Sequence, residues 1–225
     1  MFTTTTVLIA FIIYVLVRYF IIPFLRVWPG DMPQAKRLRR LESAGEFIKY
    51  FKLVSKTMPA LRKIPEKDRI NPQLSEKMML AICGVNECSS CSYLHTQTAL
   101  EKGVTDSQIR ELLAGQFGGE AAQDVPALLF AQHYAESRGQ VSYEAREAVV
   151  RVYGENKVRH MSGYLLTVFF GNLCCNTVEY YTHGRLDDKE RRRLYFTYIL
   201  ARPVEWFISR GAAKRELKRK KMDGK

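Results

Sequence analysis

Apolar residues recur every three or four positions from residue 73 onward, and strand-like alternation is almost absent. This period places the apolar residues on one face of a helix, so the sequence predicts a series of amphipathic helices. Helices that pack through such faces give an all-α fold. The expected helices span 73–85, 88–102, 105–114, 124–138, 142–154 and 157–182, and two basic helices separated near Arg202 and Pro203 end the chain.

Several of these boundaries carry capping signals. Thr105 and Gln108 match a capping box, in which the side chain of each residue binds the backbone of the other. Asp124 precedes a helix with Pro126 in its first turn, where the missing proline N–H costs nothing. Ser142 is a further N-cap candidate. These signals predict where three of the helices begin.

The N-terminal segment has a different pattern. Val7–Leu25 is apolar apart from Arg18, and as a helix it is long enough to cross about 30 Å of hydrocarbon. Basic residues lie only on its C-terminal side, so the positive-inside rule predicts a single-pass membrane anchor with the remaining chain facing the cytoplasm. A central arginine is atypical of a simple span, and an interfacial or buried helix that never crosses is the alternative.

The segment between the anchor and the main helices is less regular. Trp28–Gln34 carries the proline and glycine of a linker, Ala35–Lys56 resembles a charged amphipathic helix near the membrane, and Thr57–Pro72 is expected to be mostly irregular. The predicted organisation is an anchor (1–27), a juxtamembrane helix and linker (28–72), a helical domain (73–186) and a basic tail (187–225).

Charge is concentrated at the C-terminus. The 225 residues carry a net charge of +12, and residues 185–225 contribute 14 basic and 6 acidic side chains. Zinc-finger spacing and RNA-binding aromatic signatures are absent from the sequence, which argues against nucleic acid as the partner. Leu194–Arg210 mixes aromatic residues with arginine, and a basic run follows it. We expect an interfacial helix on an anionic membrane, with plain solvated charge as the alternative.

The candidate chemistry lies in a C-x-x-C pair. On a helix Cys88, Cys91 and His95 share one stripe, with Cys88 nearest the positively polarised N-terminus. A helix N-terminus favours the reactive thiolate, and an imidazole can take up its proton. Glu76, on the preceding helix, could orient that imidazole if the two helices pack. The second cysteine would resolve a sulfenic acid into a disulfide.

Two further interpretations concern cysteines. Cys88 and Cys91, with His95 and Glu76, could instead supply four zinc ligands, although three ligands at this spacing on one helix are unusual for a structural site. Cys83 lies on the same face as Glu76 and is interpreted as a buried packing residue, with a third thiol near the site as the alternative. Cys174 and Cys175 are also interpreted as packing residues, because a disulfide between adjacent cysteines is strained.

The pattern of Glu76, eleven residues, C-x-x-C, three residues and His95 resembles the alkyl hydroperoxidase D family of the carboxymuconolactone decarboxylase-like superfamily. The string T-A-L-E-K-G-V-T-D-S-Q-I-R-E-L that follows is also similar, and the resemblance covers about 71–186. It implies an alkyl hydroperoxidase D-like helical bundle that forms trimers or larger homo-oligomers. It also implies peroxidase or disulfide-reductase activity without a metal or an organic cofactor.

The resemblance further implies roles for the site residues. Cys91 is the peroxide-reactive thiol, Cys88 is the resolving thiol, and a proton relay runs from Cys91 through His95 to Glu76. Some members carry a histidine directly before the second cysteine, where this chain has Ser90. Superfamily decarboxylases lack the paired cysteines, so decarboxylation is disfavoured.

Together these features predict a membrane-anchored, peroxiredoxin-type oxidoreductase that reduces organic hydroperoxides. Its electron donor is expected to be a lipoyl-bearing or thioredoxin-like protein, as the resemblance implies. Two alternatives remain at this level. One is a non-catalytic assembly or partner-binding protein on the same fold, and the other is a general thiol–disulfide exchanger.

Overall fold

The computed structural model describes residues 39–223. Within this range the regular elements are helices and none is a strand, so the all-α prediction is confirmed. Among the described residues, no helix combines the length and the apolar character that a membrane span requires. The predicted anchor, residues 1–27, lies outside the described range. The anchor and the predicted domain boundaries therefore stay predictions.

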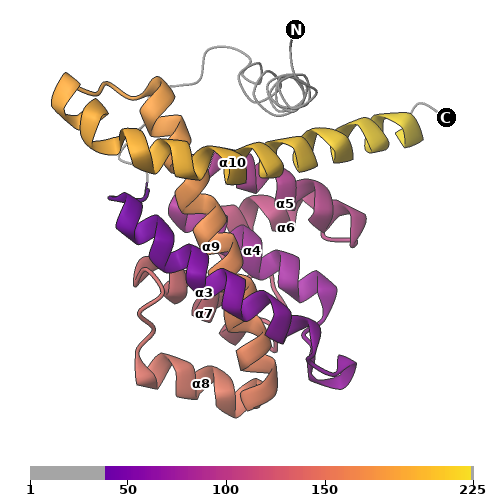
Figure 1. Cartoon of the computed structure of the whole chain (residues 1–225). Helices are drawn as coiled ribbons and strands as arrows, with labels where there is room; N and C mark the ends of the chain where they lie inside the picture. The colour runs from indigo at the N-terminus through magenta and orange to yellow at the C-terminus, as the bar shows by residue number, and fades with distance from the viewer. Residues whose placement is uncertain (1–38, 224–225) are drawn as a thin grey trace, which may run out of the picture. The chain divides into compact units, whose positions relative to one another are not determined.

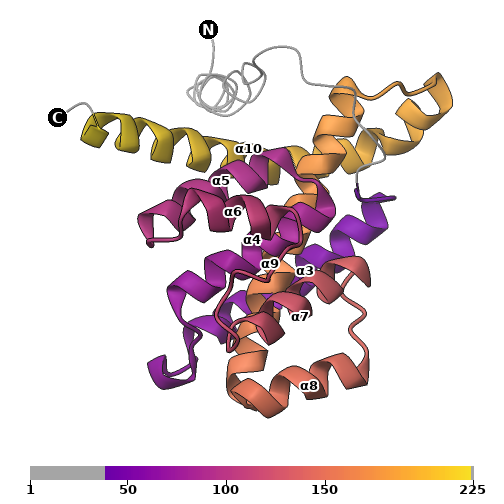
Figure 2. The same cartoon turned by 180° about the vertical axis from the view of Figure 1, so that it is seen from behind.

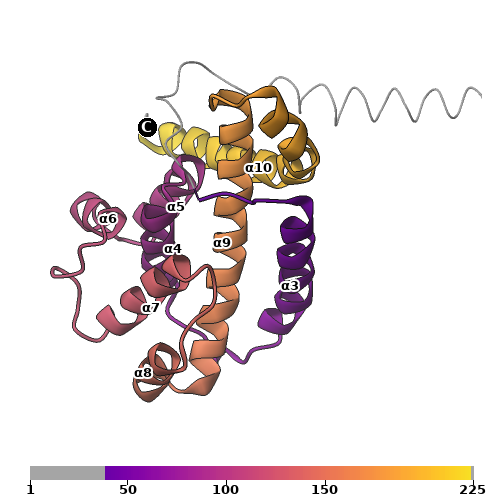
Figure 3. The ribbon, with the colours of Figure 1, turned by 90° about the vertical axis from the view of Figure 1, so that its left-hand side faces the viewer.

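The helices pack around one long central helix. Figure 3 shows α9 running through the middle, with α3 on one side and α4 and α7 on the other. Figures 1 and 2 show α10 crossing one end and α8 at the opposite end. The elements are α3 (Ala44–Arg62), the 3-10 helix η2 (Glu66–Asp68), α4 (Pro72–Asn86), α5 (Ser89–Glu101), α6 (Asp106–Leu113), α7 (Val125–Glu136), α8 (Tyr143–Tyr153), α9 (Glu155–His183) and α10 (Asp188–Asp223).

The predicted capping signals are found at two helix starts. At α6, Thr105 accepts a hydrogen bond from the backbone of Gln108, and the Gln108 side chain accepts one from the backbone of Thr105. At α8, the Ser142 side chain accepts a hydrogen bond from the backbone of Ala145. Asp124 precedes α7 as predicted, but its side chain does not cap the helix and instead bonds elsewhere. Local signals therefore located these starts correctly.

The start of α3 differs from the prediction. The sequence predicted a helix over 35–56, but the described residues before Ala44 are not helical. The helix begins directly after Ser43. The backbone of Ser43 is extended rather than helical, and its side chain accepts a hydrogen bond of 3.2 Å from the backbone N–H of Glu46. This bond satisfies one of the N–H groups that have no partner within a helix.

The end of α3 also lies elsewhere than expected. The segment 57–72 was predicted to be irregular, but α3 continues through Pro59 to Arg62, and η2 follows. An internal proline removes one hydrogen bond and is normally costly. Packing outweighs this cost here, because the buried face of α3 lies against α9, with Leu61 directly at Gly163.

The C-terminal helix is continuous, so the predicted break near Arg202 and Pro203 is wrong. α10 passes through Pro203 as one helix, and Figure 1 shows its ribbon changing direction along its length. Prolines bend helices without ending them when packing holds both halves. Leu194 and Ala201 are buried against the bundle, and Arg202 forms a buried ion pair of 2.9 Å with Glu205.

Close packing around α4 depends on a glycine. A Cβ atom at Gly84 would collide with the backbone carbonyl of Leu113 at the end of α6. Backbone atoms cannot yield as a flexible side chain can, so only glycine allows this approach. The contact fixes α6 against the end of α4, close to the turn into α5.

A buried lysine forms ion pairs with the loop between α6 and α7. Lys77 is only 5% exposed and lies in the middle of α4. Its ammonium group pairs with Glu120 and, at 3.3 Å, with Asp124. Burial lowers the pKa of Lys77, but the two carboxylates outweigh burial, and the net result is a raised pKa. Lys77 is therefore charged and holds the loop on the core.

Candidate thiol site

The C-x-x-C pair lies where α4 turns into α5. α4 ends with Glu87 in a left-handed conformation (φ 51°), and the backbone N–H of Cys88 bonds the carbonyl of Cys83. Cys88 is the N-cap of α5 with an extended backbone, and Cys91 lies in the first turn. Cys91 therefore lies within the helix as predicted, whereas Cys88 lies just before its first residue. Cys88 is therefore the cysteine closest to the unpaired backbone N–H groups at the start of α5.

Two asparagines of α9 hold this turn against the central helix. Asn86 donates a hydrogen bond of 3.0 Å to Asn172, and Asn176 donates one of 2.7 Å to the backbone carbonyl of Asn86. All three residues are fully buried. Because these bonds join the end of α4 to α9, they fix the first turn of α5 beside α9.

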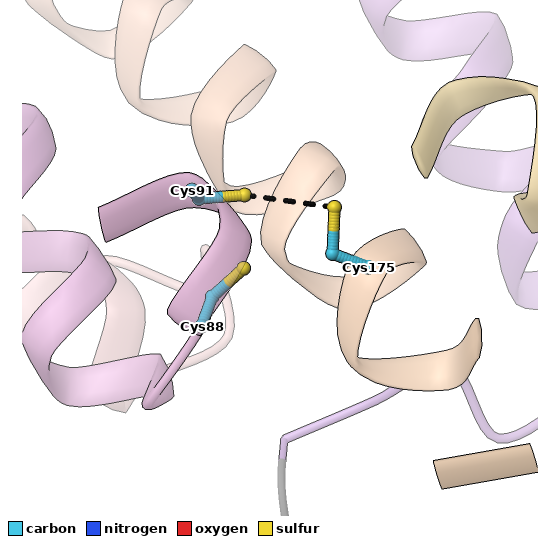
Figure 4. Close-up of side chains that lie close together, drawn as sticks. All are labelled: Cys88, Cys91 and Cys175. Carbon is cyan, nitrogen blue, oxygen red and sulfur yellow. Dashed lines mark hydrogen bonds between the residues drawn. The ribbon is translucent and has the colours of Figure 1, made fainter. Parts of the chain in front are cut away.

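This arrangement brings a third thiol to the pair. The Sγ atoms of Cys88, Cys91 and Cys175 all lie within 4.8 Å of one another, and those of Cys91 and Cys175 are 3.7 Å apart. Figure 4 shows Cys175 pointing from α9 toward the two cysteines. All five cysteines of the chain are free and buried. Cys175 is free and buried, as expected of a packing residue, but the sequence did not predict that its sulfur lies beside the pair.

The three thiols differ in acidity. Burial opposes ionisation of Cys91, but hydrogen bonds from Cys175, Cys83 and Cys88, with the charge of His95, outweigh burial and hold the pKa of Cys91 well below its ordinary value. Burial raises the pKa of Cys88. Hydrogen bonds to Cys88 and Cys91, together with burial, raise the pKa of Cys175. Among the three thiols, ionisation is therefore favoured at Cys91.

Glu76 and His95 are brought together as the sequence predicted. His95 Nδ1 lies 2.9 Å from Glu76 Oε2. Lys102 Nζ lies 2.7 Å from the other oxygen, Oε1, and was not identified from the sequence. Burial raises the pKa of Glu76, but His95 and Lys102 outweigh burial and lower it. An ionised carboxylate can only accept a hydrogen bond, so the hydrogen in this contact is on Nδ1 of His95, and Nε2 is the ring nitrogen left for proton exchange at the site.

A cavity of about 260 Å³ opens in front of one sulfur of the cluster. Cys91 and His95 both line it, whereas Cys88 and Cys175 do not. Its other walls are mostly apolar and come from α4, α5, α9 and α10: Met79, Leu94, Val168, Gly171 and Ile208 are among them. Cys91 is thus the sulfur that a small apolar molecule in the cavity would meet.

The ligand set considered for zinc is arranged differently from the prediction. Within residues 39–223, the one group of candidate ligand atoms close enough for an ion consists of Cys88, Cys91 and Cys175. His95 instead directs Nδ1 at Glu76. The predicted combination of two cysteines with His95 and Glu76 is therefore not assembled.

Substituting Glu76 by glutamine tests the electrostatics of the site. The folded-state pKa of Glu76 is lowered, so its carboxylate stabilises the fold above its ordinary value of 4.5, and this contribution is lost as the pH falls through the lowered value. At neutral pH, E76Q should cost about 1.5–3 kcal/mol, the strength of hydrogen bonds to a charged group. The deficit should shrink below pH 4.5, measured by melting temperatures between pH 7 and pH 2.

The exposed Glu42 provides the control for this experiment. E42Q should leave the melting temperature close to that of the unsubstituted chain at every pH. A deficit of E76Q that stayed constant down to pH 2 would contradict the assigned charge state.

A family comparison matches part of the chain. Residues 49–137 match the model of the carboxymuconolactone decarboxylase family. The match begins within α3 and ends after α7, whereas the predicted resemblance covered 71–186. It includes Glu76, Cys88, Cys91 and His95, while Cys175 lies beyond it. Comparisons with curated proteins and with solved structures found no match. This match agrees with the superfamily resemblance found in the sequence, and residues 49–137 are similar to the carboxymuconolactone decarboxylase family.

Proposed function

We propose that the chain is a membrane-anchored thiol peroxidase that reduces organic hydroperoxides at Cys91. One observation supports this above the others: Cys91 and His95 line the same apolar cavity, so an acid–base group stands beside a reactive sulfur. The low pKa of Cys91 supplies the thiolate, and the Glu76 carboxylate keeps Nε2 of His95 available. Apolar walls favour an alkyl hydroperoxide over hydrogen peroxide.

The proposed reaction has two chemical steps within the protein. The Cys91 thiolate attacks the terminal oxygen of the hydroperoxide, the O–O bond breaks, and the alkoxide leaves as an alcohol with a proton from protonated His95. Cys91 becomes a sulfenic acid. The Cys88 thiol then attacks the Cys91 sulfur, a disulfide forms, and the hydroxyl group leaves as water. Because Ser90 replaces the histidine of some family members, His95 and Glu76 alone carry the relay.

Reduction of the disulfide needs two electrons from a dithiol donor. Cys88 is fully buried and Cys91 is only 2% exposed, so a folded protein cannot reach either sulfur directly. A lipoyl arm is long and slender, and it satisfies this constraint better than a thioredoxin-like surface does. The same burial disfavours a general exchanger of protein disulfides.

Membrane attachment is the second part of the proposal. α10 exposes Phe196 (70%) and Phe207 (68%) on the side that does not pack on the bundle. Arginines and lysines flank these rings, as in helices that lie at an anionic membrane surface. Together with the anchor predicted at 1–27, this surface would hold the cavity near lipid hydroperoxides on the cytoplasmic side. Homo-oligomers, trimeric or larger, are proposed from the family resemblance.

The proposal is tested by counting thiols in the full-length chain in detergent micelles. One equivalent of cumene hydroperoxide should remove two thiols, release cumyl alcohol, and leave disulfide at the cluster. Dihydrolipoamide should restore both thiols and support repeated turnover. If cumene hydroperoxide left all thiols intact while a model disulfide was reduced, the exchanger would be correct, and if neither reaction occurred, the protein would be non-catalytic.

A further inference from the structure

A second redox pair is available at the thiol site. We propose that Cys175 is a third redox thiol, which forms a disulfide with Cys91 between α5 and α9. This inference deepens the proposed peroxidase function and rests on it for the peroxide step. Cys175 lies outside residues 49–137, which match the family model, so the C-x-x-C motif does not predict its participation.

Distance and orientation support the pair. The sulfurs of Cys91 and Cys175 are 3.7 Å apart, and Figure 4 shows both side chains directed into the space between α5 and α9. A disulfide bond is about 2.05 Å long, so the two sulfurs must approach by about 1.7 Å. Rotation of both side chains about χ1 moves sulfur by more than this, and the helices need not separate.

The chemistry of Cys175 suits a resolving thiol. Oxidation of Cys91 by a hydroperoxide gives a sulfenic acid and an alcohol, as above. The Cys175 sulfur attacks the Cys91 sulfur, the S–S bond forms, and the hydroxyl leaves as water with the proton that Cys175 releases. Cys88 can then attack Cys91, which transfers the disulfide to the C-x-x-C pair and returns Cys175 to a thiol. Atoms and electrons balance in both steps without a further reactant.

The adjacent cysteine is the matched control. Cys174 is also fully buried, but it is absent from the cluster of sulfurs around Cys91. Burial raises the pKa of Cys174, with a smaller contribution from Cys91. One residue along a helix turns a side chain by about 100°, so Cys174 and Cys175 share size and burial but not direction. Only Cys175 should pair with Cys91.

The experiment uses the full-length chain and removes Cys88, which competes for Cys91. We compare C88S, C88S/C174S and C88S/C175S, each oxidised in two separate arms. One arm uses one equivalent of cumene hydroperoxide, and the other uses diamide, which forms disulfides without a peroxide step. Unreduced peptide mapping by mass spectrometry identifies each disulfide, and dimedone traps sulfenic acid.

C88S and C88S/C174S should lose two thiols and give a Cys91–Cys175 peptide in both arms. C88S/C175S should give no such peptide, and its Cys91 should be labelled by dimedone in the peroxide arm. Disulfide in the diamide arm without any oxidation by cumene hydroperoxide would overturn the peroxidase function but support the Cys91–Cys175 pair. A free Cys175 in both arms of C88S, or a Cys83–Cys91 disulfide in its place, would overturn the inference.

If the serine variants do not fold, the unsubstituted chain tests whether Cys91 and Cys175 form a disulfide. Helix content by circular dichroism identifies such failures before oxidation. With limiting diamide and acid quenching at successive times, the unsubstituted chain should yield Cys91–Cys175 peptide early, which then gives way to Cys88–Cys91. Exclusive formation of Cys88–Cys91 at every time point would overturn the inference.

Discussion

Replacing Cys91 by serine is expected to lower the rate of cumene hydroperoxide reduction by about 10³-fold or more, because a serine hydroxyl does not ionise near neutral pH. Cys91 is the sulfur that lines the cavity, and its pKa is held well below the ordinary value. Cys88 cannot replace it, because burial raises the pKa of Cys88 and it does not line the cavity. The measurement is alcohol production by the full-length chain with dihydrolipoamide as reductant.

C174S is the control for C91S, because it removes a buried thiol from the same core without touching the cluster. It should retain the rate of the unsubstituted chain. Alkylation of Cys91 should also stay fast when the pH falls below about 8.5, the ordinary pKa of a thiol, because the pKa of Cys91 is lowered. If C91S kept its activity, the nucleophile would be another residue and the proposed mechanism would be refuted.

The largest effect on stability is expected for Lys77→Met. Methionine fills a similar volume but leaves the carboxylates of Glu120 and Asp124 without their cation. The Glu120 side chain is only 1% exposed, so water cannot compensate. Breaking a buried ion pair by removing one partner costs about 3–5 kcal/mol. Denaturant unfolding of the full-length chain, followed by circular dichroism, measures the change in unfolding free energy.

Lys220 provides the exposed comparison for this substitution. It pairs with Glu216 at 2.7 Å, yet its side chain is 67% exposed. Such pairs contribute about 0–1 kcal/mol, so K220M should barely change the unfolding free energy. A loss for K77M as small as that for K220M would show that the loop between α6 and α7 does not depend on Lys77.

Most of the fold could be predicted because its boundaries depend on local chemistry. The capping box of Thr105 and Gln108 and the serine cap at Ser142 depend on residues three positions apart, and both are present. Two of the wrong boundaries involve prolines, Pro59 and Pro203, each of which predicts a break and instead lies inside a helix. A helix continues through a proline when its buried face packs well enough, and packing is not visible in local sequence.

The candidate site, like the fold, could be predicted from the sequence only in part. Glu76 and His95 could be paired from helical spacing on two successive helices. Lys102 could have been paired with Glu76 by the same helical spacing, because it lies seven residues after His95 and so on the same face of the helix. Cys175 could not be found in this way. Its position beside Cys91 depends on how α9 is placed against the turn, and buried asparagines of α9 fix that placement across more than 80 residues of sequence.

The C-terminal helix α10 forms part of the cavity in front of Cys91. Ile208 of α10 forms part of the wall in front of Cys91, and it fits there because Gly171 of α9 has no side chain; a Cβ at Gly171 would lie 3.0 Å from Ile208. α10 also reaches α5 through an ion pair of 2.7 Å between Arg215 and Glu101. The width of the cavity in front of Cys91 thus depends on how the basic C-terminal helix packs on α5 and α9, and under the proposed function a shift of this helix would change which hydroperoxides fit.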